Sequence, residues 1–447
     1  MRKEIGTKYA VMAAVQLPDV SDVEFEASLA ELRDLAKTLG YEITATFTQK
    51  RSNFDATAYL GTGKREEIRA FVNAGMPEPE RILHDASDPE AGKIEAVFVD
   101  HEISPSQARN LENEVGCEVM DRTMVILEIF QRHASSRAAR AQVEIARLAY
   151  MAPRLREAAK LAGPQGRQRS GTGGRGAGES HTELDRRKIR DRIAELQLEI
   201  AAMDVERKTQ RARRLDRQGI ANVALVGYTN AGKSTLMRAL TGSDVLVENK
   251  LFATLDTTVR VLQPESVPRV LVSDTVGFIK NLPHGLVASF KSTLEEAVNA
   301  SLLLHVIDAS DPGYERQREV TDAVLAEIGA GDLPRLRVFN KIDQAGDAAE
   351  EAEREAMLNE QYPGCIVMSA RRSMDVAKLH DAIIAFFHRD RIEAEVFLPW
   401  SDQKMRGEIF ANCEVLEERS DDEGAILRIR GDRERVEDLC ERFGVKD

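Results

Sequence analysis

The sequence predicts an α/β protein of several domains, and its apolar pattern leads to that prediction. Short apolar runs alternate with helix-like stretches over residues 8–130, as in an α/β domain, and again over residues 220–390, as in a doubly wound sheet. Between these regions the strand-like runs vanish, and apolar residues recur at alternating spacings of four and three. A chain of 447 residues has room for about three domains. We therefore expect an α/β domain with a helical hairpin, then a doubly wound sheet, then a small α+β domain.

The N-terminal α/β domain is expected to span residues 1–137. Apolar runs at residues 11–17, 82–83 and 96–99 predict strands. The stretches 24–39, 66–72 and 105–114 are helix-like. Alternation of this kind is typical of an α/β domain.

A helical hairpin is expected over residues 138–217. Its loop, residues 163–180, is rich in Gly and Arg and short enough to join two antiparallel helices. Pro153 is expected to kink or end the first helix. The apolar positions that predict two coiled-coil-like helices are Ala141, Ile145, Leu148, Ala152 and Leu155, then Ile189, Ile193, Leu196, Ile200 and Met203.

Two further domains complete the predicted organisation. Residues 218–390 alternate strand and helix patterns and are expected to form a parallel doubly wound sheet. Residues 391–447 are expected to form a small α+β domain that ends in a helix. Its predicted strands are residues 396–398, 413–416 and 425–429.

Composition narrows the class of protein. No run of about 18 apolar residues occurs, and the first ten residues lack the apolar core of a signal peptide. We therefore expect a cytoplasmic protein with no membrane span. The four cysteines form no CxxC pair and the eight histidines no metal-ligand spacing, so neither disulfides nor zinc are predicted.

Charge is distributed unevenly along the chain. The net charge is -13, but residues 131–220 hold 21 Lys and Arg against 11 Asp and Glu. Such asymmetry can direct one region to a polyanion such as nucleic acid. A solvated, charge-laced helical surface explains the same composition, and charge alone does not separate the two.

A complete phosphate-binding loop follows the apolar run at residues 222–226. From Gly227 to Ser234 the sequence reads Gly-Tyr-Thr-Asn-Ala-Gly-Lys-Ser, and a helix is expected from Thr235. The glycines let backbone N–H groups face a β-phosphate, and the helix N-terminus adds positive potential. Lys233 is expected to reach the β- and γ-phosphates, and the Ser234 hydroxyl to bind Mg²⁺. The nucleotide-binding residues assigned here are Gly227, Asn230, Ala231, Gly232, Lys233, Ser234 and Thr235.

A second motif, Asp274-Thr275-Val276-Gly277, follows the apolar run at residues 270–272. An Asp at the end of a strand beside the phosphate loop can hold Mg²⁺ through water. The backbone N–H of Gly277 can meet the γ-phosphate. Lys233 and Gly277 are therefore candidate catalytic residues, and Asp274 and Gly277 candidate nucleotide-binding residues.

A third motif decides the base. It is Asn340-Lys341-Ile342-Asp343, in which the Asp343 carboxylate can accept from guanine N1–H and N2–H₂ while Asn340 and Lys341 hold the ring. Adenine lacks this pair of donors, so ATP is disfavoured. A fourth, Ser369-Ala370, follows a strand expected at residues 365–368 and supplies a backbone N–H toward guanine O6. Together the motifs predict a site for GTP and GDP with Mg²⁺.

Hydrolysis of GTP is expected to be slow in the isolated protein. Small signalling GTPases place Gln directly after DxxG to orient the attacking water, but here that residue is Phe278. A Phe side chain cannot hydrogen-bond to water. The group that assists hydrolysis in place of this Gln must then come from the backbone, a cation or a partner.

Six stretches outside the shared GTPase motifs are distinctive: residues 61–67 (GTGKREE), 104–112 (SPSQARNLE), 121–123 (DRT), 175–179 (RGAGE), 282–284 (LPH) and 292–296 (STLEE). With them the chain resembles the HflX family of translational GTPases over nearly its whole length. The resemblance implies that Phe252 and Thr254 belong to the first switch and bind nucleotide, with Thr254 as a catalytic residue and second hydroxyl ligand of Mg²⁺.

The resemblance also implies partners. The family binds the large ribosomal subunit and is associated with splitting stalled ribosomes, its N-terminal domain and hairpin facing ribosomal RNA. Potassium-activated relatives of this GTPase class carry an ion-ligating Asn at the position of Asn230, so K⁺ is a candidate activator, unless Asn230 only caps the loop. We expect a monomer. The alternative function is a GTP-controlled protein-binding switch with no RNA partner.

Overall fold

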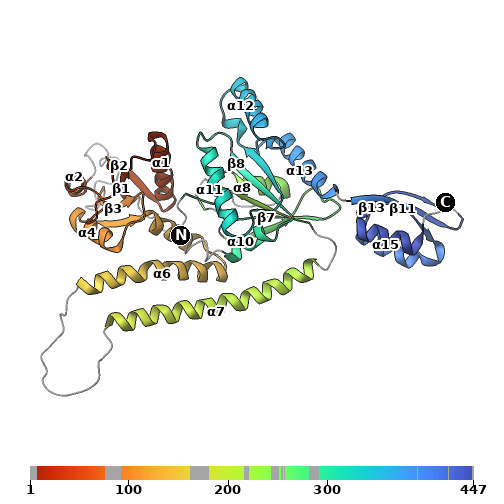
Figure 1. The fold of residues 1–447 in the computed structure, drawn as a ribbon, viewed down its shortest axis with the longest axis horizontal. Helices are drawn as coiled ribbons and strands as arrows, with labels where there is room; N and C mark the ends of the chain where they lie inside the picture. The colour runs from red at the N-terminus through yellow and green to blue at the C-terminus, as the bar shows by residue number, and fades with distance from the viewer. Residues whose placement is uncertain are drawn as a thin grey trace, which may run out of the picture. The chain divides into compact units, whose positions relative to one another are not determined.

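The computed structural model describes residues 8–75, 92–161, 181–215, 221–242, 251–252, 255, 257–280, 291–389, 391–420 and 422–444 (Figure 1). The chain forms two compact units, each built from three pieces of sequence. The first consists of Met1–Ala202, Glu248–Leu255 and Asn281–Lys291. The second consists of Met203–Val247, Asp256–Lys280 and Ser292–Asp447.

The first unit contains a four-stranded sheet in the order β2-β1-β3-β4, with all neighbours parallel. Strand β1 is central and is buried at every position after its first residue, as expected when helices cover both faces. The strands expected near residues 11–17 and 96–99 are confirmed, whereas residues 82–83 lie outside the described part. The strands are β1 (Lys8–Gln16), β2 (Tyr41–Lys50), β3 (Ile94–Val99) and β4 (Glu118–Asp121).

Three helices of the first unit begin at side chains that accept hydrogen bonds from their free N–H groups. Ser21 caps α1, Asp121 caps α5, and Ser104 forms a reciprocal capping box with Gln107 at the start of α4. The N-terminal helices predicted from periodicity are all present. They are α1 (Asp22–Thr38), α2 (Thr62–Ala74) and α4 (Pro105–Val115), followed by α5 (Arg122–His133).

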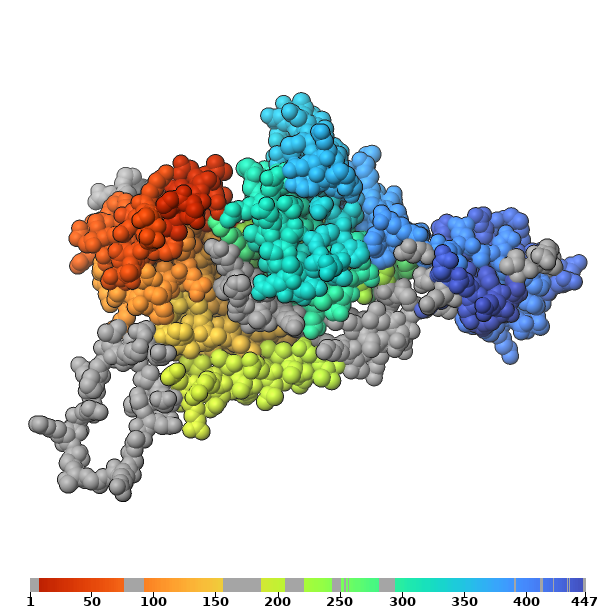
Figure 2. All heavy atoms as spheres, viewed as in Figure 1, coloured from red at the N-terminus to blue at the C-terminus, as the bar shows by residue number. Residues whose placement is uncertain are grey.

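The predicted hairpin is present as α6 (Arg137–Leu161) and α7 (His181–Leu215). Ion pairs join Arg137 to Glu199 and Arg192 to Glu144, so the helices run antiparallel. Figure 2 shows them in contact, α6 in yellow and α7 in yellow-green. Pro153 was expected to kink or end the first helix, and the helix does not end there, because α6 continues through it to Leu161. The loop 163–180 lies outside the described residues.

The second unit holds a six-stranded sheet in the order β10-β9-β8-β5-β7-β6. All neighbours are parallel except β6 and β7. The order changes direction at β5, and ligands bind at such points beyond the carboxyl ends of the strands. The strands are β5 (Ala221–Gly227), β6 (Thr258–Val261), β7 (Val270–Asp274), β8 (Leu302–Asp308), β9 (Arg335–Asn340) and β10 (Ile366–Val367).

Helices of this sheet include α8, which begins directly after the phosphate loop, and α11 and α13, which contact neighbouring elements of the sheet or α8. Their bounds, with the others of this region, are α8 (Lys233–Thr241), α10 (Lys291–Val298), α11 (Tyr314–Glu327), η1 (Ile342–Gln344), α12 (Ala348–Gln361) and α13 (Ser373–His388).

The C-terminal residues form a three-stranded antiparallel sheet in the order β11-β13-β12 with its own apolar core. Val396, Leu427 and Ile429 are fully buried in that core. The predicted α+β arrangement is thus present. Its elements are β11 (Arg391–Pro399), η2 (Trp400–Met405), α14 (Arg406–Asn412), β12 (Glu414–Ser420), β13 (Gly424–Asp432) and α15 (Arg433–Phe443). Among the described residues, no helix has the length and apolar content needed to cross a bilayer.

Candidate nucleotide site

The loop between β5 and α8 has a shape that glycine alone permits at two positions. Gly227 has φ +149°, and a Cβ there would lie 2.2 Å from the Val306 carbonyl oxygen. Gly232 has φ +95°, and its Cβ would lie 2.3 Å from Asn340 Nδ2. Side chains at either position would be excluded by contact and by backbone conformation. The glycine pattern therefore serves the close packing of the loop against β8 and β9.

Lys233 is buried at the N-terminus of α8, where its ammonium group folds back on the loop. Its Nζ donates to the carbonyl oxygens of Gly227 (2.9 Å) and Tyr228 (2.8 Å). Burial lowers the pKa of Lys233 to about 8, the nearby Asp274 carboxylate opposes that shift, and Lys341 adds to it. The carbonyl groups of Gly227 and Tyr228 thus hold the Lys233 ammonium group close to where the phosphates are expected.

A hydroxyl and a carboxylate meet beside Lys233. Ser234 Oγ, in the first turn of α8, lies 2.9 Å from Oδ2 of Asp274, the last residue of β7. Asp274 is almost fully buried. Hard oxygen donors of this kind are the ligands that Mg²⁺ prefers, so the residues present fit this ion.

The predicted base motif lies beside the loop at the end of β9. Asn340 uses both ends of its amide as a brace, because Nδ2 donates to the Ala231 carbonyl (2.9 Å) and Oδ1 accepts from the Ala370 N–H (2.9 Å). Lys341 has φ +63° and its ammonium pairs with Asp308 at 2.7 Å. The Asn340 brace thus joins the phosphate loop to the Ser369-Ala370 segment.

Asp343 and Ser369 are each held near this brace. Asp343 lies 3.6 Å from the exposed Arg371 guanidinium. Ser369 is buried, its N–H donates to Asp375 Oδ2 (2.9 Å) and its hydroxyl accepts from the Arg371 N–H (3.2 Å). The turn that carries Ala370 is therefore fixed by side chains of its own segment as well as by Asn340.

The structure gathers most of the predicted site residues, but not all of them. Asn230 has φ +60° at the turn of the phosphate loop, and Thr235 lies half-buried in the first turn of α8. Phe252 belongs to the first unit, where its ring packs edge-on against Phe130 at 4.6 Å. Thr254 lies outside the described residues.

Sequence reasoning missed two residues of this region. Tyr228, inside the phosphate loop, contacts the segment after Gly277 through its hydroxyl. Asp308, the ion-pair partner of Lys341, ends strand β8. A carboxylate at the carboxyl end of a buried parallel strand is a signal that could have indicated Asp308. No local pattern indicated the contact of Tyr228, which spans 52 positions of the chain.

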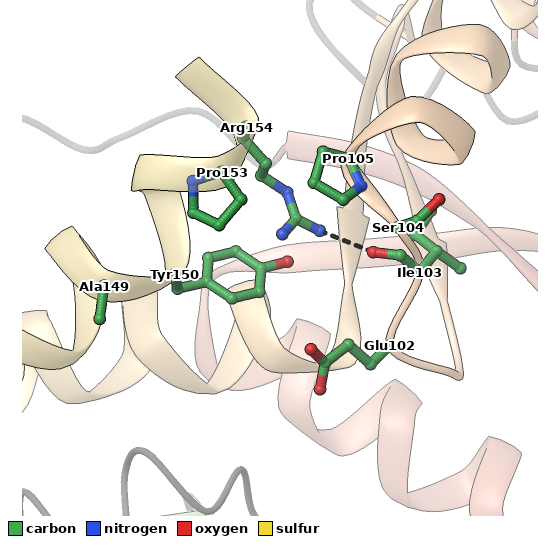
Figure 3. A pocket seen from close by; sticks show the side chains of 8 residues that line it. All are labelled: Glu102, Ile103, Ser104, Pro105, Ala149, Tyr150, Pro153 and Arg154. Atoms are coloured by element: carbon green, nitrogen blue, oxygen red, sulfur yellow. Dashed lines mark hydrogen bonds between the residues drawn. The ribbon is translucent and has the colours of Figure 1, made fainter. Parts of the chain in front are cut away.

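A pocket of about 500 Å³ lies in the first unit, between α6 and the segment that leads from β3 into α4 (Figure 3). Arg154 stacks on the Tyr150 ring at 3.8 Å and donates to Asp121 (2.8 Å) and to the Ile103 carbonyl (3.1 Å). Burial raises the pKa of Tyr150 above its usual range and Asp121 raises it further, so the phenol stays protonated and donates to Asp121. These contacts hold the part of α6 around Pro153 against Ile103 and Asp121. The lining residues are Glu102, Ile103, Ser104, Pro105, Ala149, Tyr150, Pro153 and Arg154.

The strand order, the glycine loop, the adjacent hydroxyl and carboxylate, and the braced guanine motif define a P-loop GTPase. Family models agree along the chain: "GTP-binding GTPase N-terminal" matches residues 26–131, "GTP-binding GTPase Middle Region" residues 133–214, and "50S ribosome-binding GTPase" residues 222–341. The chain belongs to the HflX GTPase family. It therefore binds and hydrolyses GTP.

Relatives cover nearly the full length. The chain is 52% identical over 440 residues to a GTPase HflX of Gluconacetobacter diazotrophicus, covering 94% of each chain. It is 34% identical over 423 residues to GTPase HflX of Escherichia coli, covering 94% of this chain and 93% of that one. A solved GTP-binding protein from Sulfolobus solfataricus in complex with GDP has a TM-score of 0.42 and 23% identity, covering 84% of this chain and 98% of that one.

Proposed function

We propose that this GTPase acts on the large ribosomal subunit and splits or rescues stalled ribosomes, with the hairpin contacting ribosomal RNA. The observation that carries the proposal is the connection of a GTPase domain, whose family is described as ribosome-binding, to a helical hairpin in the most basic part of the chain. Phosphate backbones attract such regions strongly at low salt.

Within the nucleotide site, each residue has a proposed task. Lys233 binds the β- and γ-phosphates, Gly277 donates its N–H to the γ-phosphate, and Asp343 accepts from guanine. Ser234 and Thr254 would ligate Mg²⁺, with Asp274 acting through water. When bound, Mg²⁺ neutralises charge on the β- and γ-phosphates. The proximity of Ser234 to Asp274 supports this assignment.

Hydrolysis is proposed to be slow until the ribosome is bound. Phe278 is buried at 1% exposure, so it neither orients nor approaches an attacking water. In other GTPases an arginine finger supplies positive charge that stabilises the transition state. In this protein a K⁺ ion held near Asn230 is proposed to supply that charge. Turnover in KCl above that in NaCl at matched ionic strength supports K⁺, and equal rates reject it. We further propose a cytoplasmic monomer.

The ribosome proposal is tested by sedimentation with purified large subunits in the presence of a non-hydrolysable GTP analogue. Replacing Arg167, Arg169 and Arg175 by Gln should weaken binding and reduce its salt slope by up to about 3, because each arginine is expected to neutralise one phosphate. A matched control replaces Arg428, Arg430 and Arg433 of the C-terminal domain, where the change in slope should be absent.

Two results separate the alternatives, and GTP affinity serves as a control. Equal affinity and salt slope for the loop variant and the parent would move the RNA contact to the N-terminal domain, at Lys64, Arg65 or Arg109. Absence of any ribosome binding would favour the protein-binding switch. GTP affinity should be unchanged by the loop variant, because the substituted residues lie outside the nucleotide-binding motifs.

A further inference from the structure

An ion pair joins the base motif to the end of the neighbouring strand. Lys341 Nζ donates to Asp308 Oδ2 at 2.7 Å, and the two side chains are 18% and 13% exposed. Asp308 is the last residue of β8 and pairs with Asn340 of β9 in the sheet. Its other carboxylate oxygen accepts from the N–H and from the hydroxyl of Ser310, at 3.0 Å and 2.6 Å. The Asp308 carboxylate is therefore held in place by the strand end and by Ser310.

The ion pair holds the Lys341 side chain along the phosphate loop. The Lys341 backbone has φ +63° directly before η1, and Lys341 Cε lies 3.9 Å from a Cβ built on Gly232. Burial lowers the pKa of Lys233 and the charge of Lys341 lowers it further, so the two ammonium groups lie within electrostatic range of each other. The Lys341 stem thus extends from the base motif to the phosphate loop.

A guanosine in the proposed site has to span the same two places. Its base is assigned to Asp343, which follows closely after Lys341, and its phosphates to the loop that contains Gly232 and Lys233. The methylene groups of Lys341 would then form an apolar wall beside the guanosine. A free lysine side chain has many rotamers, and ordering it on binding costs free energy and lowers affinity. Pairing with Asp308 orders this side chain in advance.

We infer that Asp308 is a positioning residue of the guanosine site: its carboxylate holds the Lys341 ammonium beside the phosphate loop, so that the Lys341 stem is ordered when nucleotide binds. This inference rests on the proposed nucleotide site and adds a residue to it. Because the stem lies beside the guanosine, which GDP and GTP share, Asp308 should contribute equally to the binding of both. Its contribution should disappear when residue 341 carries no charge.

The test measures the GDP affinity of the full-length protein in a double-mutant cycle of Asp308→Asn and Lys341→Met. Asparagine keeps the size of Asp308 and an oxygen for Ser310 but removes the charge, whereas methionine keeps an unbranched stem without the ammonium. Asp308→Asn alone should weaken GDP binding about threefold to tenfold, which corresponds to the cost of ordering one lysine side chain. The double variant should bind GDP as tightly as Lys341→Met alone.

Asp311→Asn is the matched control, because Asp311 lies in the same loop after β8 and has a different task. Its carboxylate accepts from the Gly313 N–H and from Gln317 Nε2, each at 2.7 Å, and so supports the start of α11. GDP affinity should be unchanged in this variant. Circular dichroism melting checks the fold of each protein, and Asp308→Ser replaces Asp308→Asn in the cycle should the latter unfold.

Three results would overturn the inference about Asp308. The first is a GDP affinity of Asp308→Asn equal to that of the parent. The second is an equal loss in the parent and in the Lys341→Met background. The third is a loss confined to a non-hydrolysable GTP analogue, which would place the effect at the γ-phosphate. Failure of the underlying nucleotide site is recognised separately, because Lys233→Ala and Asp343→Asn would then also bind GDP as tightly as the parent.

Discussion

Asp343 is the residue to which we assign the choice of base. Replacing it by Asn exchanges an acceptor of two guanine N–H groups for a side chain that can donate to the O2 of xanthine. Hydrogen bonds to a charged group are worth about 1.5–3 kcal/mol, so GTP affinity should fall at least tenfold while affinity for xanthosine triphosphate rises.

Fluorescence binding titrations with both nucleotides check this expectation. Arg371→Ala is the matched control, because it removes the neighbour of Asp343 at 3.6 Å while its own side chain is 71% exposed. An exposed ion pair of this kind contributes little. Unchanged base preference in Asp343→Asn would show that guanine is read elsewhere.

Lys233 gives nucleotide binding a dependence on pH. Because burial lowers its pKa to about 8, an increasing fraction of the free protein carries a neutral amine as pH rises above that value. Bound phosphates favour the charged ammonium and raise its pKa, so the complex holds more protons than the free protein. Binding should therefore take up protons, and affinity should fall, as pH rises through 8.

Calorimetry of GDP binding in buffers of different ionisation enthalpy measures this uptake. The uptake attributable to Lys233 should be small at neutral pH and approach one proton per site well above pH 8. A binding enthalpy that does not depend on buffer at the higher pH would contradict the assigned role of Lys233.

Single residues of the site could be predicted to the extent that their contacts are local in sequence. The phosphate loop places Lys233 and Ser234 directly after the turn that they serve, and their spacing alone indicated them. The partners of Tyr228 and Lys341 lie 52 and 33 positions away. Such pairings depend on the strand order, which apolar periodicity does not contain.

Among the elements, the start of α5 carries the most buried ion pairing that the described part of the first unit shows. Arg122 is 1% exposed and pairs with Asp100 at the end of β3 (2.8 Å) and with Glu31 of α1. Removing a buried partner leaves charge uncompensated and costs about 3–5 kcal/mol. Arg122→Ala should therefore lower the stability of this unit by that amount.

Denaturant unfolding followed by circular dichroism, with exchange of β1 amides to locate the change, measures the loss. Arg137→Ala is the matched control, because Arg137 pairs with Glu199 on the hairpin while 74% exposed. Its effect should stay below about 1 kcal/mol. Similar losses in both variants would mean that the buried cluster adds no stability of its own.

Helices and strands could be predicted where an element is buried on one face or on all sides. Prediction failed where buried and exposed residues are mixed along the element. The continuous apolar run of β1 indicated a buried strand, whereas β2, a partly exposed strand with the sequence YEITATFTQK, was not predicted. Helix α6 was expected to kink or end at Pro153, and it does not end there. The contacts of Arg154 with Ile103 and Asp121 supply tertiary support there that no helix propensity describes.

At the scale of the whole molecule, the first unit is completed by residues from inside the GTPase region. Leu251, Phe252 and Leu255 are buried in it, and the Leu251 N–H donates to the Thr38 hydroxyl at 3.3 Å. Phe252→Ala should remove the ring that packs on Phe130 and destabilise the first unit by about 3–5 kcal/mol.

Hydrogen exchange of α5 amides reports this effect in the intact protein. The control is Val23→Ala, a substitution on α1 at a side chain that is 76% exposed, which should change exchange little. If α5 exchanges in Phe252→Ala as in the parent, the segment around Phe252 lies on the first unit without supporting it.

The same insertion sets an order for biosynthesis. The strands and helices of the first unit emerge from the ribosome well before Phe252, and domains of a nascent chain fold as they appear. The apolar site beside Phe130 is filled by Phe252. This residue is translated about fifty residues after the first piece of the unit, which ends at Ala202. Nascent chains halted between these points would carry an unfinished core, open to chaperones and proteases. The first unit can thus complete its apolar core only after the ribosome has translated the GTPase region as far as Phe252.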